Sequence, residues 1–441
     1  MEKVFDTLDA VLAPVRNLLG KNKITKFLLD EYMSYSRNIR VVLAVMVFFA
    51  LMFMIFAVQI LFWGLGYTDM SNLYPFGQWI IGDLGLVSLG GGAFTTGFLL
   101  YIFRNDKLTP IINSTVLIGF LCYLFTFVFL VFDIGQPLRA WFGYTYPNWG
   151  QGLMPISMLT EVVWCLTFYF LILCVELLPV ALKHRILDGI PLLNRTGHYL
   201  HRLMWIFAAA GTFLSFFHQG SLGGGMWDSL YGKAVWFRPH HIYFFVVIIG
   251  ATAGGTSFMA LWAFLAGKIM KKEVVPAETF HSIAKISGIM FIVYFAARLA
   301  DVIMMATHWV PLFGRDYLAL QGGYYGLWML VLQFIFAAVA IAMLAIKKNR
   351  ENEKTFLIGL SSGVLAMSTD KLIVVLNGSS VPNFPWREFA AYNPTFQEWF
   401  IFLGGLSIMG MIYMWCARYL PLFPHAEKHG HGDQGGHGVA E

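Results

Sequence analysis

Charge is what this sequence most lacks. Only 12% of its 441 residues are charged, and 58% are hydrophobic, whereas an average soluble domain has about 25% charged residues. This deficit excludes an ordinary soluble domain. It indicates a polytopic membrane protein.

Cysteine is also scarce, and phosphate-binding motifs are missing. The four cysteines, Cys122, Cys165, Cys174 and Cys416, form no CxxC pair, so we expect no iron–sulfur cluster held by this chain and no metal site. The glycines of GGGAFTTG, 90–97, follow no strand and therefore predict close helix packing rather than nucleotide binding.

Long apolar runs are what the sequence has in abundance. A helix of about 20 apolar residues crosses a bilayer and satisfies its own backbone hydrogen bonds, and nothing alternates in polarity as membrane barrel strands do. We expect an all-α fold with about ten transmembrane helices. They lie near 40–66, 77–103, 111–133, 154–182, 198–218, 240–267, 281–307, 324–346, 354–377 and 398–420.

Lys and Arg are concentrated in the N-terminal segment and in alternate loops. The positive-inside rule then predicts a bacterial or archaeal cytoplasmic membrane protein with both termini in the cytoplasm. The net charge of +5 is therefore mostly a property of the cytoplasmic face, and no nucleic-acid partner is expected. Residues 1–39 are predicted to be amphipathic and basic, and the His- and Gly-rich tail 425–441 to be disordered.

An internal repeat divides the membrane domain, 40–424. The segment LGGGAFTTGFLLYIF, 89–103, is similar to IIGATAGGTSFMALWAF, 248–264. Four spans separate the copies, so they would run parallel. The repeat predicts two four-helix bundles, about 77–218 and 240–377, flanked by one extra helix at each end.

Ionisable residues inside the spans gather toward the predicted outer side. Each costs a few kcal/mol in a membrane unless it is paired or faces water. Three have no counter-ion nearby in the sequence and are expected to line an outward-opening polar pocket: Asp133, Glu161 and His218. Arg298 with Asp301, and Asp370 with Lys371, are either neutralising pairs or functional groups.

Histidine placement bears on haem, which needs two His at equal depth on different helices. Two such sets of histidines exist near the span ends. They are His218 with His240, His241 or His308, and His201 with His281. Most of these lie at span ends, so we expect no haem. The long outer loops 134–153, 218–240, 308–323 and 378–398 predict a docking surface for a partner.

Four motifs in this order carry a family resemblance: PFGQWIIGDLG, FDIGQPLRAWFG, LTEVVWCLTFYFLILCVELLP and FFHQGSLGG. The chain resembles the NrfD/PsrC family of quinone-interacting membrane subunits over about 40–424, and most of all the ten-helix HybB/DsrP-like branch. The resemblance implies menaquinone or ubiquinone bound near the outer face, and no haem. It also implies a ferredoxin-like iron–sulfur subunit docked outside, with a further catalytic or multihaem cytochrome subunit.

Carried onto this chain, the resemblance makes Asp133, Glu161 and His218 the residues that face the quinone or transfer its protons. Asp83, Arg298 and Asp301 are further candidates for the quinone site. The function expected is a redox-complex subunit that takes up or releases protons, with Glu176, His201 and Lys285 as conceivable inner relays if turnover is electrogenic. A secondary transporter, whose site would lie near the midplane, and a purely structural anchor are the alternatives.

Overall fold

The computed structural model describes residues 23–74, 76–135, 137–145, 158–182, 190–224, 240–270, 275–384 and 386–423. Within these ranges all regular structure is helical, which confirms the all-α prediction. The amphipathic pattern predicted for the first 22 residues and the tail 425–441 lie outside the described residues.

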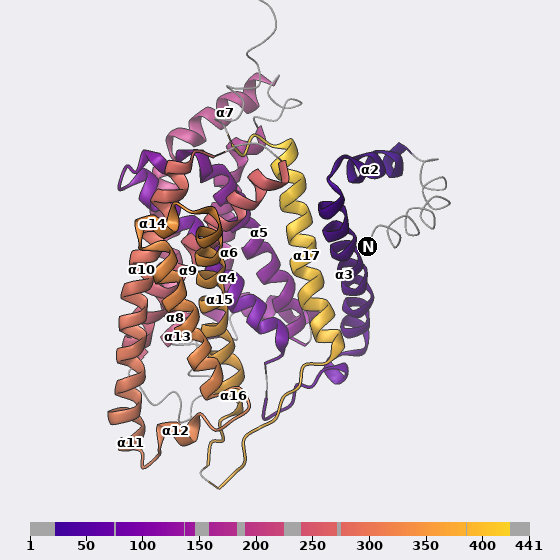
Figure 1. The fold of residues 1–441 in the computed structure, drawn as a ribbon. Helices are drawn as coiled ribbons and strands as arrows, with labels where there is room; N and C mark the ends of the chain where they lie inside the picture. Colours follow the sequence, from indigo (N-terminus) through magenta and orange to yellow (C-terminus); the bar gives the residue numbers. More distant parts are fainter. Residues whose placement is uncertain are drawn as a thin grey trace, which may run out of the picture.

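Long helices run between two ends of the molecule, with short helices at each end (Figure 1). Nine described helices are long and apolar enough to span a membrane, and α7 with α8 makes ten. The long helices are α3 (Arg37–Trp63), α4 (Gln78–Tyr101), α5 (Ile112–Asp133), α6 (Met158–Leu182), α8 (Met204–Gly224), α9 (His240–Met270), α10 (Ala277–Met304), α13 (Leu327–Leu344), α15 (Glu353–Leu372) and α17 (Phe396–Tyr419).

The two ends of the molecule carry different short helices (Figure 1). One end, called the basic end below, holds α2 (Lys23–Ser34), α7 (Pro191–Arg202) and α14 (Lys347–Arg350). The opposite end, called the α12 end, holds α11 (Val310–Leu312), α12 (Tyr317–Leu320) and α16 (Gly378–Ser380).

Helix contacts follow the predicted repeat. Helices α4, α5, α6 and α8 pack as a first bundle, and α9, α10, α13 and α15 as a second, with α4 and α8 contacting α9. The two additional helices, α3 and α17, pack against each other, and α17 also contacts α5 (Figure 1).

The predicted fifth span, 198–218, is wrong at its start. Residues 198–202 belong to α7, which meets α8 at a bend of 57°. The segment NRTGHYLHR gives α7 a strongly amphipathic pattern, and such a polar face is stable at a membrane surface rather than in hydrocarbon. The membrane-crossing helix therefore begins at Met204.

Glycines let the two bundles approach closely. A Cβ on Gly92 of α4 would lie only 2.2 Å from the carbonyl carbon of Gly255 on α9. The similar segments of the internal repeat therefore meet backbone to backbone, as small residues allow between membrane helices. This confirms that GGGAFTTG is a packing motif.

Gly92→Ala should destabilise the protein by about 1–3 kcal/mol, because the added methyl meets backbone that cannot move aside. The measurement is the thermal unfolding temperature of the detergent-purified protein. Gly85→Ala, on the same helix, is the matched control, since a Cβ there meets nothing within 4 Å. Equal unfolding temperatures for the two variants would show that the crossing is not tight.

Candidate functional site

Two carboxyl groups meet near the α12 end of the first bundle. Asp83 lies on α4 and Asp133 is the last residue of α5, and the two side chains face each other. All four carboxyl oxygens are buried, and Asp133 interacts with the Asp83 carboxyl, the Trp79 indole and the Gly77 backbone in contacts that fall short of strict hydrogen-bond geometry. Because burying two acids together is costly, this pair is a candidate for proton exchange or for binding a polar ligand.

Trp79 adds a hydrogen-bond donor to this carboxyl pair. It lies one helical turn before Asp83, its side chain is fully buried, and its indole is beside Asp133. Its buried N–H has the Asp133 carboxyl as the nearby acceptor. A donor and two acids thus lie together, and Phe132 packs on the same indole with its ring 5.8 Å away.

Glu398 at the start of α17 lies near Asp133 but has a different environment. Its oxygens accept hydrogen bonds from the backbone N–H groups of Asp69 (3.2 Å) and Thr395 (2.9 Å) and from the Tyr392 hydroxyl. Burial, and then the nearby carboxylate, raise the pKa of Tyr392, so this phenol stays protonated and donates. Glu398 therefore joins the loops 64–77 and 386–395, and we assign it a structural role.

His218 on α8 is completely buried. Its ring lies edge-on to the Tyr169 ring of α6 at 5.2 Å. Glu161 is two turns before Tyr169 on the same face of α6 and interacts with it electrostatically. His218 thus contacts α6 at Tyr169, two turns along that helix from Glu161.

The neighbour of His218 fixes its position. Gln219 donates to the carbonyl oxygen of Val87 (2.9 Å) and accepts from the Ser88 hydroxyl (3.1 Å), so α8 is bound to α4 at this level. Both Gln219 and Ser88 are buried. The HQ dipeptide thus combines a fixed histidine with the residue that fixes it.

Arg298 and Asp301 belong to a separate network in the second bundle. They form a buried ion pair on α10, and Arg298 also lies 3.8 Å from Asp370 of α15. Lys371 contacts Asp370 at 3.3 Å. The two predicted pairs are thus one neutral cluster of two cations and two anions.

Three uncharged residues complete this second-bundle network. Gln333 and Tyr294 donate to Asp370 at 2.7 and 3.1 Å, and Arg298 lies 5.5 Å over the ring of Tyr243. The sequence carried one signal for Gln333, since it is the only strongly polar residue in LWMLVLQFIFAAVAIAML. The other two were missed because a tyrosine in an apolar span is usually core.

Both helices that carry the network continue into π-helical turns. Met305–Trp309 follows α10 and Ile373–Asn377 follows α15. Single π-helical turns inside helices are rare and are often found at functional sites. Here each turn changes the helix face shortly after the charged residues.

A small cavity opens near the basic end of the first bundle. It measures about 210 Å³, and its polar lining includes Glu176, His201 and Tyr101. Glu176 is 7% exposed. Two of the conceivable inner relays, Glu176 and His201, therefore line one cavity, while Lys285 is not among its lining residues.

The predicted site residues therefore fall into three groups. Asp83 lies with Asp133, His218 contacts Tyr169 two turns along α6 from Glu161, and Arg298 with Asp301 lies in the second bundle. For haem, the side chains of His240 and His241 lie outside the described residues, and His308 is exposed.

The chain is similar to known proteins over most of its length. The polysulphide reductase NrfD family matches residues 66–383, which run from the loop before α4 to the loop after α16. The integral membrane subunit of menaquinone reductase from Nitratidesulfovibrio vulgaris is 35% identical over 375 residues, which cover 83% of this chain and 88% of that protein.

Two more distant relatives also belong to redox systems. A probable Ni/Fe-hydrogenase 2 b-type cytochrome subunit of Escherichia coli is 23% identical, over 86% of this chain and 91% of that protein. A selenate reductase subunit of Mesobacillus selenatarsenatis is 20% identical, over 82% and 89%. With its helical membrane fold and the family match over most of its length, this chain belongs to the NrfD family of polysulphide reductase membrane subunits.

Proposed function

We propose that this chain is the membrane subunit of a respiratory oxidoreductase, and that it exchanges electrons and protons with a quinone at the α12 end of the first bundle. The observation that carries the proposal is the contact between Asp83 and Asp133, buried beside the Trp79 indole. The menaquinone reductase subunit among its relatives supports the choice of substrate.

The chemistry of the site suits a quinone. Two-electron reduction of a quinone also requires two protons, so its carbonyl oxygens need donors and groups that exchange protons. Two carboxyls in contact cannot both carry a charge cheaply, and such a pair holds a proton that it can give up. The Trp79 indole N–H is the fixed donor of the site.

His218 and Glu161 provide a second proton-exchanging group. General acids and bases typically contribute 10²–10⁴-fold to a rate. The Tyr169 ring packs against His218. Arg298 and Asp301 take the role of a supporting network, because their charges are already compensated.

Protons are proposed to come from the basic end. The cavity lined by Glu176 and His201 lies at that end, and proton uptake from this side with quinone reduction at the other would make turnover electrogenic. Proteoliposomes test this directly, because quinone reduction should then generate a membrane potential that an ionophore abolishes. Turnover without a potential would exclude this route.

The α12 end is proposed to dock a ferredoxin-like iron–sulfur subunit. A further catalytic or multihaem cytochrome subunit would bind to that subunit. Trp386 (78% exposed) stacks on Phe384 at 5.1 Å, and Tyr324 is 77% exposed at the same end. Exposed aromatic residues of this kind are typical anchors of protein interfaces. A photocrosslinker at position 386 in the assembled complex should capture that subunit.

The basic end is proposed to face the cytoplasm, because the Lys- and Arg-rich loops lie there. Both termini would then be cytoplasmic, in the cytoplasmic membrane of a bacterium or archaeon. This places the carboxyl pair and the docking surface outside. A topology reporter fused after residue 423 checks the assignment.

A binding titration tests the quinone site itself. Quenching of a fluorescent quinol-site inhibitor by the purified complex should saturate. His218→Ala should weaken inhibitor binding at least tenfold, because the imidazole is one of the proposed proton-exchanging groups of the quinone site. His308→Ala is the control, since His308 is exposed on the second bundle. Absence of saturable binding to the intact complex would favour a structural anchor.

Haem is a separate question, raised by the b-type cytochrome named among the relatives. We propose that this chain acts without haem. A reduced-minus-oxidised absorption spectrum of the purified chain decides it, because bound haem b would give a sharp visible band on reduction.

A further inference from the structure

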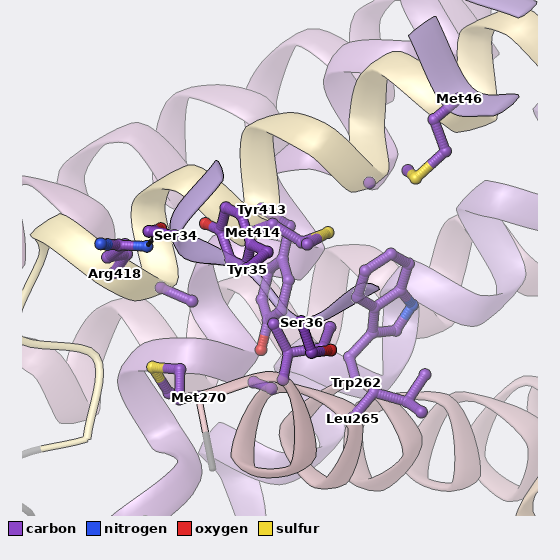
Figure 2. A pocket seen from close by; sticks show the side chains of 14 residues that line it. Ser34, Tyr35, Ser36, Met46, Trp262, Leu265, Met270, Tyr413, Met414 and Arg418 are labelled. Atoms are coloured by element: carbon purple, nitrogen blue, oxygen red, sulfur yellow. Dashed lines mark hydrogen bonds between the residues drawn. The ribbon is translucent and has the colours of Figure 1, made fainter. Parts of the chain in front are cut away.

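A larger cavity lies near the basic end, away from the carboxyl pair. It measures about 530 Å³ and lies between α9, α17 and the start of α3, where the chain turns from α2 (Figure 2). This is the boundary between the part that matches the family, 66–383, and the additional helices α3 and α17. A volume of this size is in the range of ligand pockets.

The polarity of the cavity changes with depth. Ser34 and Arg418 line one side, Met46, Trp262 and Leu265 line the other, and Ser36 lies between them (Figure 2). Helix α17 reaches the basic end at Arg418 and α9 at Met270, while Gly410 and Trp262 lie eight residues deeper on the same helices. At 1.5 Å per residue the cavity is about 12 Å deep, close to half of a bilayer core of about 30 Å.

Arg418 lies at the mouth of the cavity, and not all of its N–H donors are used in the contacts that hold it there. One of its nitrogens, Nη1, bonds Glu31 (2.9 Å) and the Ser34 hydroxyl (2.8 Å), and the guanidinium lies 5.2 Å over the Tyr35 ring. A guanidinium has five N–H donors in a planar fork that suits a phosphate. The Ser34 hydroxyl lies beside it, whereas Ser36 lies farther along the cavity (Figure 2).

The charge around the mouth is positive. Residues 23–40, which form α2, the turn and the start of α3, include four basic residues and two acidic ones, Asp30 and Glu31. On the α9 side, Lys268 pairs with Glu353 at 2.7 Å, so that side is neutral. Basic pockets between membrane helices bind anionic lipid headgroups.

We propose that this cavity binds one anionic phospholipid of the leaflet at the basic end. Its phosphate lies at Arg418 and Ser34, and an acyl chain extends past Ser36 and along Leu265 to Trp262. Arg418, the one charged residue among those that line the cavity, lies at the mouth, as a headgroup requires. The lipid fills the gap between α9 and the α3–α17 pair, and so joins these helices to the second bundle.

Native mass spectrometry of the purified complex tests the proposal, with added phosphatidylglycerol as the probe. One retained lipid is expected, and Leu265→Trp, which fills the apolar part, should lower its occupancy at least tenfold. Leu299→Trp is the matched control, because Leu299 is exposed to a similar degree (42% against 37%) on α10. Equal occupancy in these two variants would overturn the proposal.

The headgroup assignment has its own variant and control. Arg418→Gln should abolish the preference for phosphatidylglycerol over phosphatidylethanolamine. Lys107→Gln should not, although Lys107 also forms an ion pair between elements at the basic end. Equal retention of both lipids by the native protein, or displacement by inorganic phosphate alone, would contradict an anionic phospholipid site. This test measures lipid retention and does not depend on quinone activity.

Discussion

Asp133→Asn and Asp83→Asn are each expected to lower quinone-linked electron transfer by about 100-fold or more. Asparagine keeps the shape of the side chain but cannot exchange a proton, and general acid–base groups contribute about 10²–10⁴-fold. The two carboxyls act as a unit, so the double variant should be little slower than either single one. The measurement is menaquinol-analogue turnover by the assembled complex in detergent or nanodiscs.

Asp316→Asn provides the comparison for this result. Asp316 is exposed at the same α12 end, where it caps α12 by accepting from the Leu318 N–H at 3.1 Å. Its replacement should leave turnover unchanged. Full activity in a stably assembled Asp133→Asn complex would refute the proposed role of the carboxyl pair, and quinone binding would then have to be sought elsewhere.

Lys371→Met should strongly destabilise the second bundle. Lys371 is 4% exposed and lies 3.3 Å from Asp370, so its loss leaves the network with an uncompensated negative charge. Breaking a buried ion pair in this way costs about 3–5 kcal/mol. The thermal unfolding temperature of the purified protein should fall accordingly.

A second substitution separates charge balance from packing. Adding Asp370→Asn to Lys371→Met restores neutrality, and the double variant should recover much of the lost stability, which a double-mutant cycle quantifies. Lys354→Met, on the same helix but exposed, should cost almost nothing. If Lys371→Met unfolds at the same temperature as Lys354→Met, the network is not held together by its charge balance.

The sequence predicted the fold well because the bilayer leaves few choices. The length of each apolar run predicts a membrane span. The ends of the predicted spans agree with the ends of the observed helices to within a few residues at most positions, except for the fifth span. There the amphipathic α7 interrupts the run, and hydrophobicity summed over a window cannot show where a helix bends. The glycines of the repeat also indicated packing, but not that Gly92 and Gly255 meet each other.

For the candidate site, the sequence supplied the residues but not their grouping. Ionisable residues inside the spans stand out because burying them in a membrane costs free energy. This identified Asp83, Asp133, Glu161, His218, Arg298 and Asp301. Residues 50 positions apart, such as Asp83 and Asp133, meet only because α4 and α5 pack antiparallel with their α12 ends together. Glu398 was visible in the sequence as an acid, and only its saturated hydrogen bonds mark it as structural.

The sequence by itself determined that this protein is a bundle of membrane helices with buried ionisable groups, because hydrocarbon forces every span to be apolar, helical and long. Tertiary structure alone decided which of those groups share a site. The partner of a buried charge is fixed by helix packing across the fold, and spacing along one helix specifies it only for close pairs such as Arg298 and Asp301.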